Sequence, residues 1–106
     1  MKDAIVTLEV FAVFAQAKEV AITVRIGRAE PQGDGWVCPV EIAPVYAQPM
    51  AVRGVDSFHA TWLACSLVLR LLGQLKKEGA ALRSADGSEF PVDAYLAGLG
   101  SDAPGG

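Results

Sequence analysis

The stretch GVDSFHATWLACSLVLRLLGQLKKEG, residues 54–79, decides the fold. Its apolar residues recur with the spacing of a helix, so it predicts one long helix. Asp56 or Ser57 is expected to be the N-cap, because either side chain can accept hydrogen bonds from the free N–H groups of the first turn. Gly79 is expected just beyond the last turn, where a residue with positive φ often ends a helix.

The apolar surface of this predicted helix is wider than one sheet face needs. Apolar residues fill roughly two thirds of its circumference, whereas a helix lying on a sheet needs little more than about 100°. Three explanations are open. The curved sheet and the C-terminal segment wrap the helix, or a second copy packs on a self-complementary strip, or the strip accepts a different protein or an apolar ligand.

Four apolar residues of the helix are the predicted interface residues: Phe58, Trp62, Leu69 and Leu72. Phe58 and Trp62 lie one turn apart and are natural anchors, because aromatic residues concentrate binding energy in protein interfaces. The competing interpretation of the two aromatic residues is ordinary core packing. Gly73, inside the helix, costs about 1 kcal/mol relative to alanine, which indicates that something approaches the helix closely there.

The residues before the helix predict strands. Residues 4–14 alternate with two fairly apolar faces, as in a central or doubly covered strand, and residues 19–28 give a cleaner alternation. Residues 36–42 form a third strand, in which Pro39 predicts a local edge or a bulge because proline cannot donate to a ladder. A short fourth strand, residues 50–53, runs into the helix.

These elements predict an α+β fold. We expect an antiparallel sheet of about four strands in meander order, with the long helix across one face. A C-terminal hairpin should follow, since Asp86-Gly87 is a strong hairpin signal. At 106 residues, the chain is expected to be one domain over residues 1–100, with a flexible tail over residues 101–106.

Charge and hydropathy argue against two classes of partner. The formal net charge is −3, and the nine lysines and arginines are scattered, so we expect no nucleic-acid partner. Within the helix, His59 and Arg70 bound an uninterrupted uncharged stretch that is shorter than the ~18 residues of a membrane span, so we also expect no membrane partner.

Residues capable of catalysis or metal binding are sparse. The one histidine, His59, follows Asp56 and Ser57, but at a helix start these side chains do not point at one another as a catalytic triad requires. The two cysteines, Cys38 and Cys65, are interpreted as buried, reduced thiols rather than as a disulfide framework. We therefore expect no catalytic residues, no cofactor-binding residues, no metal ligands and no cofactor.

Three segments of the sequence together resemble a known family. They are VRIGR at 24–28, WVCPVEI at 36–42 and GVDSFHA at 54–60. In this order they are similar to small bacterial single-domain proteins of unknown function, with the pattern V-R-I-G-R-P, W-x-C-P-x-x-I and G-x-D-S-x-Q-A-L. Two departures are that the proline comes later, at Pro31, and that His59 stands where glutamine is expected.

The resemblance implies a bacterial, cytoplasmic, stand-alone domain and transfers no activity. We expect a non-enzymatic protein-interaction module that self-associates as a homodimer through its long apolar helix, or that binds another protein. The alternative is a small-molecule-binding protein or an enzyme with a pocket between sheet and helix. Convergent side chains of Arg25, Arg28, Glu41 or His59 would indicate the alternative.

Overall fold

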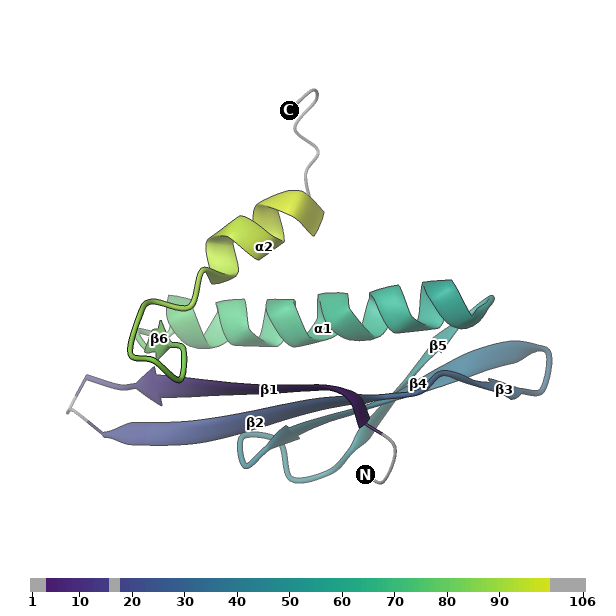
Figure 1. The fold of residues 1–106 in the computed structure, drawn as a ribbon, viewed down its shortest axis with the longest axis horizontal. Helices are drawn as coiled ribbons and strands as arrows, with labels where there is room; N and C mark the ends of the chain where they lie inside the picture. The colour runs from purple at the N-terminus through teal and green to yellow at the C-terminus, as the bar shows by residue number, and fades with distance from the viewer. Residues whose placement is uncertain (1–3, 16–17, 100–106) are drawn as a thin grey trace.

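The computed structural model describes residues 4–15 and 18–99, which form a curled antiparallel sheet, a half-barrel, carrying one long helix (Figure 1). The elements in chain order are β1 (Ala4–Val13), β2 (Glu19–Gly27), β3 (Glu30–Gln32), β4 (Gly35–Ala43), β5 (Met50–Gly54), α1 (Ser57–Lys77), β6 (Ala81–Arg83) and α2 (Val92–Leu99). The predicted α+β class is confirmed. The predicted tail, residues 101–106, lies outside the described residues.

The sheet contains the predicted meander. Strands β1, β2, β4 and β5 follow one another both in the chain and in the sheet, and each pairs antiparallel with the next. Two short strands add to the expected four. Strand β3 pairs with β4 on the same side as β2, and β6 pairs with β1 at the opposite edge.

The local edge predicted at Pro39 is confirmed, although β4 is a central strand. On one side, Pro39 pairs with Ala51 of β5. On the other side, β2 pairs with residues 40–43 and β3 with residues 35–37, so Pro39 lies opposite the break between β2 and β3. The buried Cys38 Sγ lies at the same break and donates to the carbonyl oxygen of Gly27 at 3.3 Å.

The core lies between α1 and the face of the sheet that it crosses (Figure 1). Alternate residues of the strands point toward the helix, as the period of two in a strand requires. The buried set from the three central strands is Val10, Ala12, Ile22, Val24, Ile26, Cys38, Val40 and Ile42. From α1 it includes Ala60, Ala64, Val68 and Leu72.

The predicted C-terminal hairpin is present, with β6 as its first arm. Arg83 bridges Glu89 across the hairpin, and Ser88 donates its backbone N–H and its hydroxyl to Asp86 Oδ1. Gly87 completes the turn with φ +89°, a conformation that glycine adopts without steric cost. The two hydrogen bonds from Ser88 lower the pKa of Asp86, which keeps the turn carboxylate ionised.

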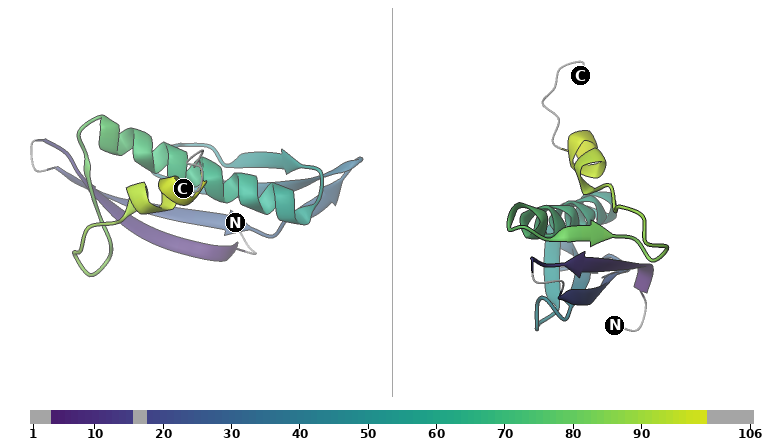
Figure 2. Two further views of the ribbon diagram at one scale, coloured as in Figure 1. Left: turned by 90° about the horizontal axis from the view of Figure 1, so that it is seen from above. Right: turned by 90° about the vertical axis from the view of Figure 1, so that its left-hand side faces the viewer.

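Helix α2 lies on the side of α1 that faces away from the sheet (Figures 1 and 2). It is close to α1 at Gly73, where an added Cβ would lie 2.9 Å from Leu96 Cδ1. The close approach predicted at Gly73 is therefore confirmed, and α2 is its cause. The C-terminal segment thus covers part of the surplus apolar surface of α1, which was one of the three explanations for that surface.

Gly73→Ala tests how firmly α2 holds α1. Alanine favours the helix by about 1 kcal/mol over glycine, and the atom that must move is the end of a flexible side chain. We expect the free energy of unfolding to stay unchanged or to rise by up to about 1 kcal/mol, measured by denaturant titration. A loss of more than about 1 kcal/mol would show that Leu96 cannot yield.

Candidate functional site

The N-terminal half of α1 carries two large apolar side chains in solvent. Phe58 is 78% exposed and Trp62 is 41% exposed. They lie one turn apart, on the same side of the helix. Leu69, seven residues after Trp62, continues the row and is half-buried against the core. We call Phe58, Trp62 and Leu69 the α1 flank.

The side of α1 that carries the α1 flank meets the β6 hairpin and α2 only at its C-terminal end. Residues 62, 69 and 76 are spaced by seven and share one side of the helix. Lys76, the last of them, forms ion pairs with Glu89 and with Asp93. The helix crosses the sheet diagonally: its C-terminal end lies beside β6, whereas its first turn packs on Gly54 at the end of β5, so Phe58 lies near the sheet edge opposite β1.

The predicted interface residues therefore divide into two groups. Phe58 and Trp62 are exposed and lie together, as a partner surface requires. Leu69 is half-buried, so it offers only part of its side chain. Leu72 is 0% exposed and belongs to the core under α1, so it does not contribute to a partner surface and the prediction is corrected for this residue.

The start of α1 holds Phe58 in place through a closed set of hydrogen bonds. Asp56, the N-cap, accepts from the backbone N–H of His59 at 2.7 Å. In return, His59 Nδ1 accepts from the backbone N–H of Val55 at 3.0 Å. This arrangement resembles a capping box. A glutamine, the residue expected at this position, would complete a capping box, and in the structure His59 takes this capping role.

Gly54 explains why the helix begins where it does. A Cβ on Gly54 would lie 2.4 Å from the backbone nitrogen of Ala60 and 2.7 Å from its Cα. The first turn of α1 therefore packs directly on the end of β5, and only glycine leaves room for it. This contact fixes the direction in which Phe58 and Trp62 leave the fold.

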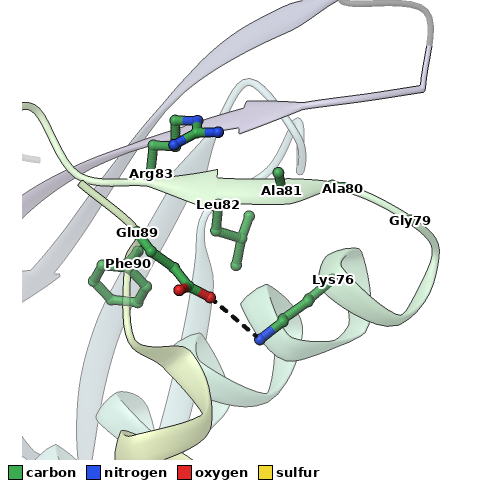
Figure 3. Close-up of a pocket in the computed structure, with 8 residues that line it drawn as sticks. All are labelled: Lys76, Gly79, Ala80, Ala81, Leu82, Arg83, Glu89 and Phe90. Carbon is green, nitrogen blue, oxygen red and sulfur yellow. Dashed lines mark ion pairs between the residues drawn. The ribbon is translucent and has the colours of Figure 1, made fainter. Parts of the chain in front are cut away.

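Lys76 is the charged centre of the contact between α1 and the C-terminal segment. It pairs with Asp93 of α2 and, at 3.8 Å, with Glu89 Oε2, as Figure 3 shows for Glu89. The hydrogen bond to Asp93 raises the pKa of Lys76. Beside it, the Phe90 and Tyr95 rings stack at 5.5 Å between centroids. These contacts hold α2 over the C-terminal half of α1.

The hollows on the surface are shallow and open. The one drawn in Figure 3, about 440 Å³, lies between the end of α1 and β6 and is lined by Lys76, residues 79–83, Glu89 and Phe90. A second, about 570 Å³, lies between α1 and α2 and is lined by Arg70, Gly73, Gln74, Lys76, Lys77, Asp93 and Leu96. The first lies at the C-terminal end of α1 beside the edge strand β6, and only the second is lined by α2.

The side chains expected to mark a ligand pocket do not converge. Arg25 and Glu41 face each other across β2 and β4, with 3.9 Å between Nη1 and Oε1, on the sheet face away from α1. His59 lies at the start of α1, beside a different hollow of about 370 Å³ that it shares with Arg53. Arg28 is exposed at the break after β2.

Arg53 was not singled out by the sequence and has a clear structural role. Its Nη2 donates to the carbonyl oxygen of Gln32 at 3.0 Å and to Asp34 Oδ1 at 3.2 Å. The guanidinium therefore ties β5 to the turn between β3 and β4. No sequence signal marks this contact, because the residues involved are about twenty positions apart.

Among the residues that the structure describes, the thiols and acidic side chains do not gather into a metal-binding group. Burial raises the pKa of both the Cys38 and the Cys65 thiol, which keeps them protonated. Within residues 4–15 and 18–99, no three His, Cys, Asp or Glu side chains are placed to hold a metal ion. By length and composition alone, α1 could cross a membrane, but core helices meet the same test and its inner face lies on the sheet.

The fold and this surface define a small α+β domain with an apolar, rigidly capped helix start. The family model described as Domain of unknown function (DUF6968) matches residues 9–92. Because the match covers well over half of the chain, the protein belongs to this family. The resemblance to a family of unknown function is thereby confirmed. No curated protein and no solved structure matches the chain.

Proposed function

We propose that the protein is a non-enzymatic interaction module that self-associates as a homodimer through the α1 flank. The observation that carries this function is the exposure of Phe58 at 78%, one turn from the partly exposed Trp62. Covering an aromatic side chain contributes about 1.5–3 kcal/mol, so a surface that holds two of them in solvent favours association. Aromatic side chains also dominate the energetics of protein interfaces.

The rigidity of the helix start supports the same function. Asp56, His59 and Gly54 hold the first turn of α1 through hydrogen bonds and close packing. The two aromatic residues are therefore presented on a fixed element, and little backbone ordering is needed when a partner binds. Pre-organised surfaces of this kind associate at a lower entropic cost.

A twofold dimer is the simplest partner for this surface. In such a dimer the same patch meets itself, so Phe58 and Trp62 of one copy can cover those of the other. The α1 flank carries no charge between Phe58 and Leu69, so the two copies bring no like charges together there. We place the module in the cytoplasm, which the free thiols of Cys38 and Cys65 support.

Light scattering coupled to size exclusion tests self-association. At high micromolar concentration we expect a mass of about 22 kDa, which is twice the 11.1 kDa of one chain. Phe58→Glu places a charge on the most exposed residue of the patch, and this variant is expected to elute as a monomer with an unchanged fold.

Ala47→Glu is the matched control, because Ala47 is exposed on the link between β4 and β5 and takes the same charge. This control should remain a dimer. A wild-type chain that is strictly monomeric at high micromolar concentration would contradict self-association. A dimer that survives Phe58→Glu would place the contact elsewhere.

A further inference from the structure

His59 holds the start of α1 through a hydrogen bond that only its neutral ring can make. Its Nδ1 accepts from the backbone N–H of Val55 at 3.0 Å. A ring nitrogen that accepts carries no proton, so the single ring proton of the neutral form lies on Nε2. A protonated ring carries a proton on both nitrogens and has no acceptor left. The bond to Val55 therefore exists only while His59 is neutral.

Protonation of His59 would set two donors against each other. The new Nδ1–H and the N–H of Val55 would meet across 3.0 Å, so either the ring or the residues before the helix must turn away. Val55 is 74% exposed, so little packing opposes such a movement. Of the two hydrogen bonds that join His59 to the cap, only the one from its backbone N–H to Asp56 would remain.

The charged groups around the ring largely offset one another. Asp34 and Arg53 line the hollow beside His59 and pair with each other at 3.2 Å, so each screens the charge of the other. The N-cap Asp56 brings a negative charge, and the positive end of the α1 dipole lies at the same place. The next turn of α1, residues 60–63, carries no charge. The hydrogen bond to Val55 is therefore the main difference between the two forms of the ring.

We propose that His59 is a pH-sensitive switch at the start of α1: its neutral ring holds the first turn, and its protonated ring releases it. Histidine gains its proton between about pH 8 and pH 5, and His59 is the only histidine in the sequence. Only the folded chain makes the bond to Val55. The stability that this bond supplies is therefore complete at about pH 8 and is lost as the pH falls through this range.

The switch would also regulate the proposed dimer. Phe58 directly precedes His59 in the first turn, so a released first turn no longer presents this aromatic side chain in one direction. Association then has to order the turn again, and the dissociation constant rises as the ordered fraction of chains falls. This consequence rests on the proposed function. The dimer should weaken at least about threefold in Kd between about pH 8 and pH 5.

Ring ¹⁵N NMR of the wild-type chain tests the hydrogen bond directly. At about pH 8 we expect the neutral form of His59 with its proton on Nε2. As the pH falls, the backbone amide signals of Val55 and Phe58 should shift with the same midpoint as the ring nitrogens. A ring that carries its proton on Nδ1 at about pH 8 overturns the switch, because such a ring cannot accept from Val55.

His59→Gln is the matched variant for a stability measurement. The side-chain oxygen of glutamine can accept from the Val55 N–H at every pH, as in a capping box. Denaturant titration at low micromolar concentration compares the two chains as monomers. Between about pH 8 and pH 5, the unfolding equilibrium constant of the wild type should rise at least about threefold relative to that of His59→Gln. An equal pH dependence of the two chains overturns the switch.

Asp56→Asn separates the histidine from the neighbouring carboxylate. Asparagine caps a helix about as well as aspartate does and carries no charge. This variant should lose at least as much stability as the wild type over the same pH range, because His59 and Val55 are unchanged. A loss that disappears in Asp56→Asn would assign the pH dependence to the carboxylate and overturn the role of His59.

The outcomes separate this switch from self-association. A chain that is monomeric at every pH contradicts the proposed dimer, whereas the ring form and the stability measurements are made on the monomer and still decide on the switch. A dimer with a constant Kd, in a chain that does lose stability in acid, overturns the regulation of the dimer and supports the switch. A dimer that weakens in acid equally in the wild type and in His59→Gln overturns the regulation by His59.

Discussion

Gly54→Ala is expected to destabilise the protein by about 3 kcal/mol, the upper end of the usual cost of overpacking. The added Cβ would lie 2.4 Å from the backbone nitrogen of Ala60 and 2.9 Å from the carbonyl carbon of His59. Both are backbone atoms of the first turn of α1, so no side-chain rotation relieves the clash. Either β5 or the start of α1 must move, and the pairing of Gly54 with Trp36 opposes such a movement.

Denaturant titration at low micromolar concentration measures this loss without a contribution from dimerisation. Gly73→Ala is the control, because it makes the same chemical change within α1 against a side chain that can move. If Gly54→Ala costs less than about 1 kcal/mol, the first turn of α1 packs on β5 more loosely than the structure shows.

Leu72→Ala is expected to cost about 3 kcal/mol, within the range for deleting a buried leucine side chain. Leu72 is 0% exposed and packs among the core residues beneath α1, so its truncation leaves a cavity that the sheet cannot easily fill. The same denaturant titration measures the loss, again at a concentration where the chain is monomeric.

Phe58→Ala is the matched control for Leu72→Ala. Phe58 lies on the same helix but is 78% exposed, so its truncation should change the stability of the monomer by no more than about 0.5 kcal/mol. Dimerisation should show the opposite contrast. Phe58→Ala should weaken the dimer more than Leu72→Ala does, because only Phe58→Ala removes surface from the α1 flank. Equal losses of monomer stability would contradict the division of the four predicted interface residues.

The helical wheel explains why the sequence placed Leu72 on the predicted interface. Residues 58 and 72 are 14 positions apart, so they point only about 40° apart around the axis. An apolar arc of two thirds of a turn shows that the helix has more than one apolar contact. It does not show which apolar residues of the helix the sheet covers and which remain on the open surface. That boundary depends on how far the sheet curls around the helix, and the spacing of apolar residues in α1 does not predict the curl.

The strands illustrate the same limit. The alternation of residues 4–14 predicted a strand with two apolar faces, and its inner face is indeed buried at Val10 and Ala12. Sequence alternation describes the two faces of a strand, however, and says nothing about its two edges. The open edge of β1 is visible only once the length and register of β6 are known, because a strand of three residues covers only part of its neighbour.

The break between β2 and β3 gives the chain a place where its length is free to vary. Strand β4 pairs with β2 through residues 40–43 and with β3 through residues 35–37. Residues 28–29, which link β2 to β3, therefore have no ladder pairing of their own. An insertion there would leave the register of both flanking strands unchanged. This accounts for the late proline of the first motif, VRIGR at 24–28. Two residues separate Arg28 from Pro31, and Pro31 lies in a terminal strand of the sheet, where the absent N–H is tolerated.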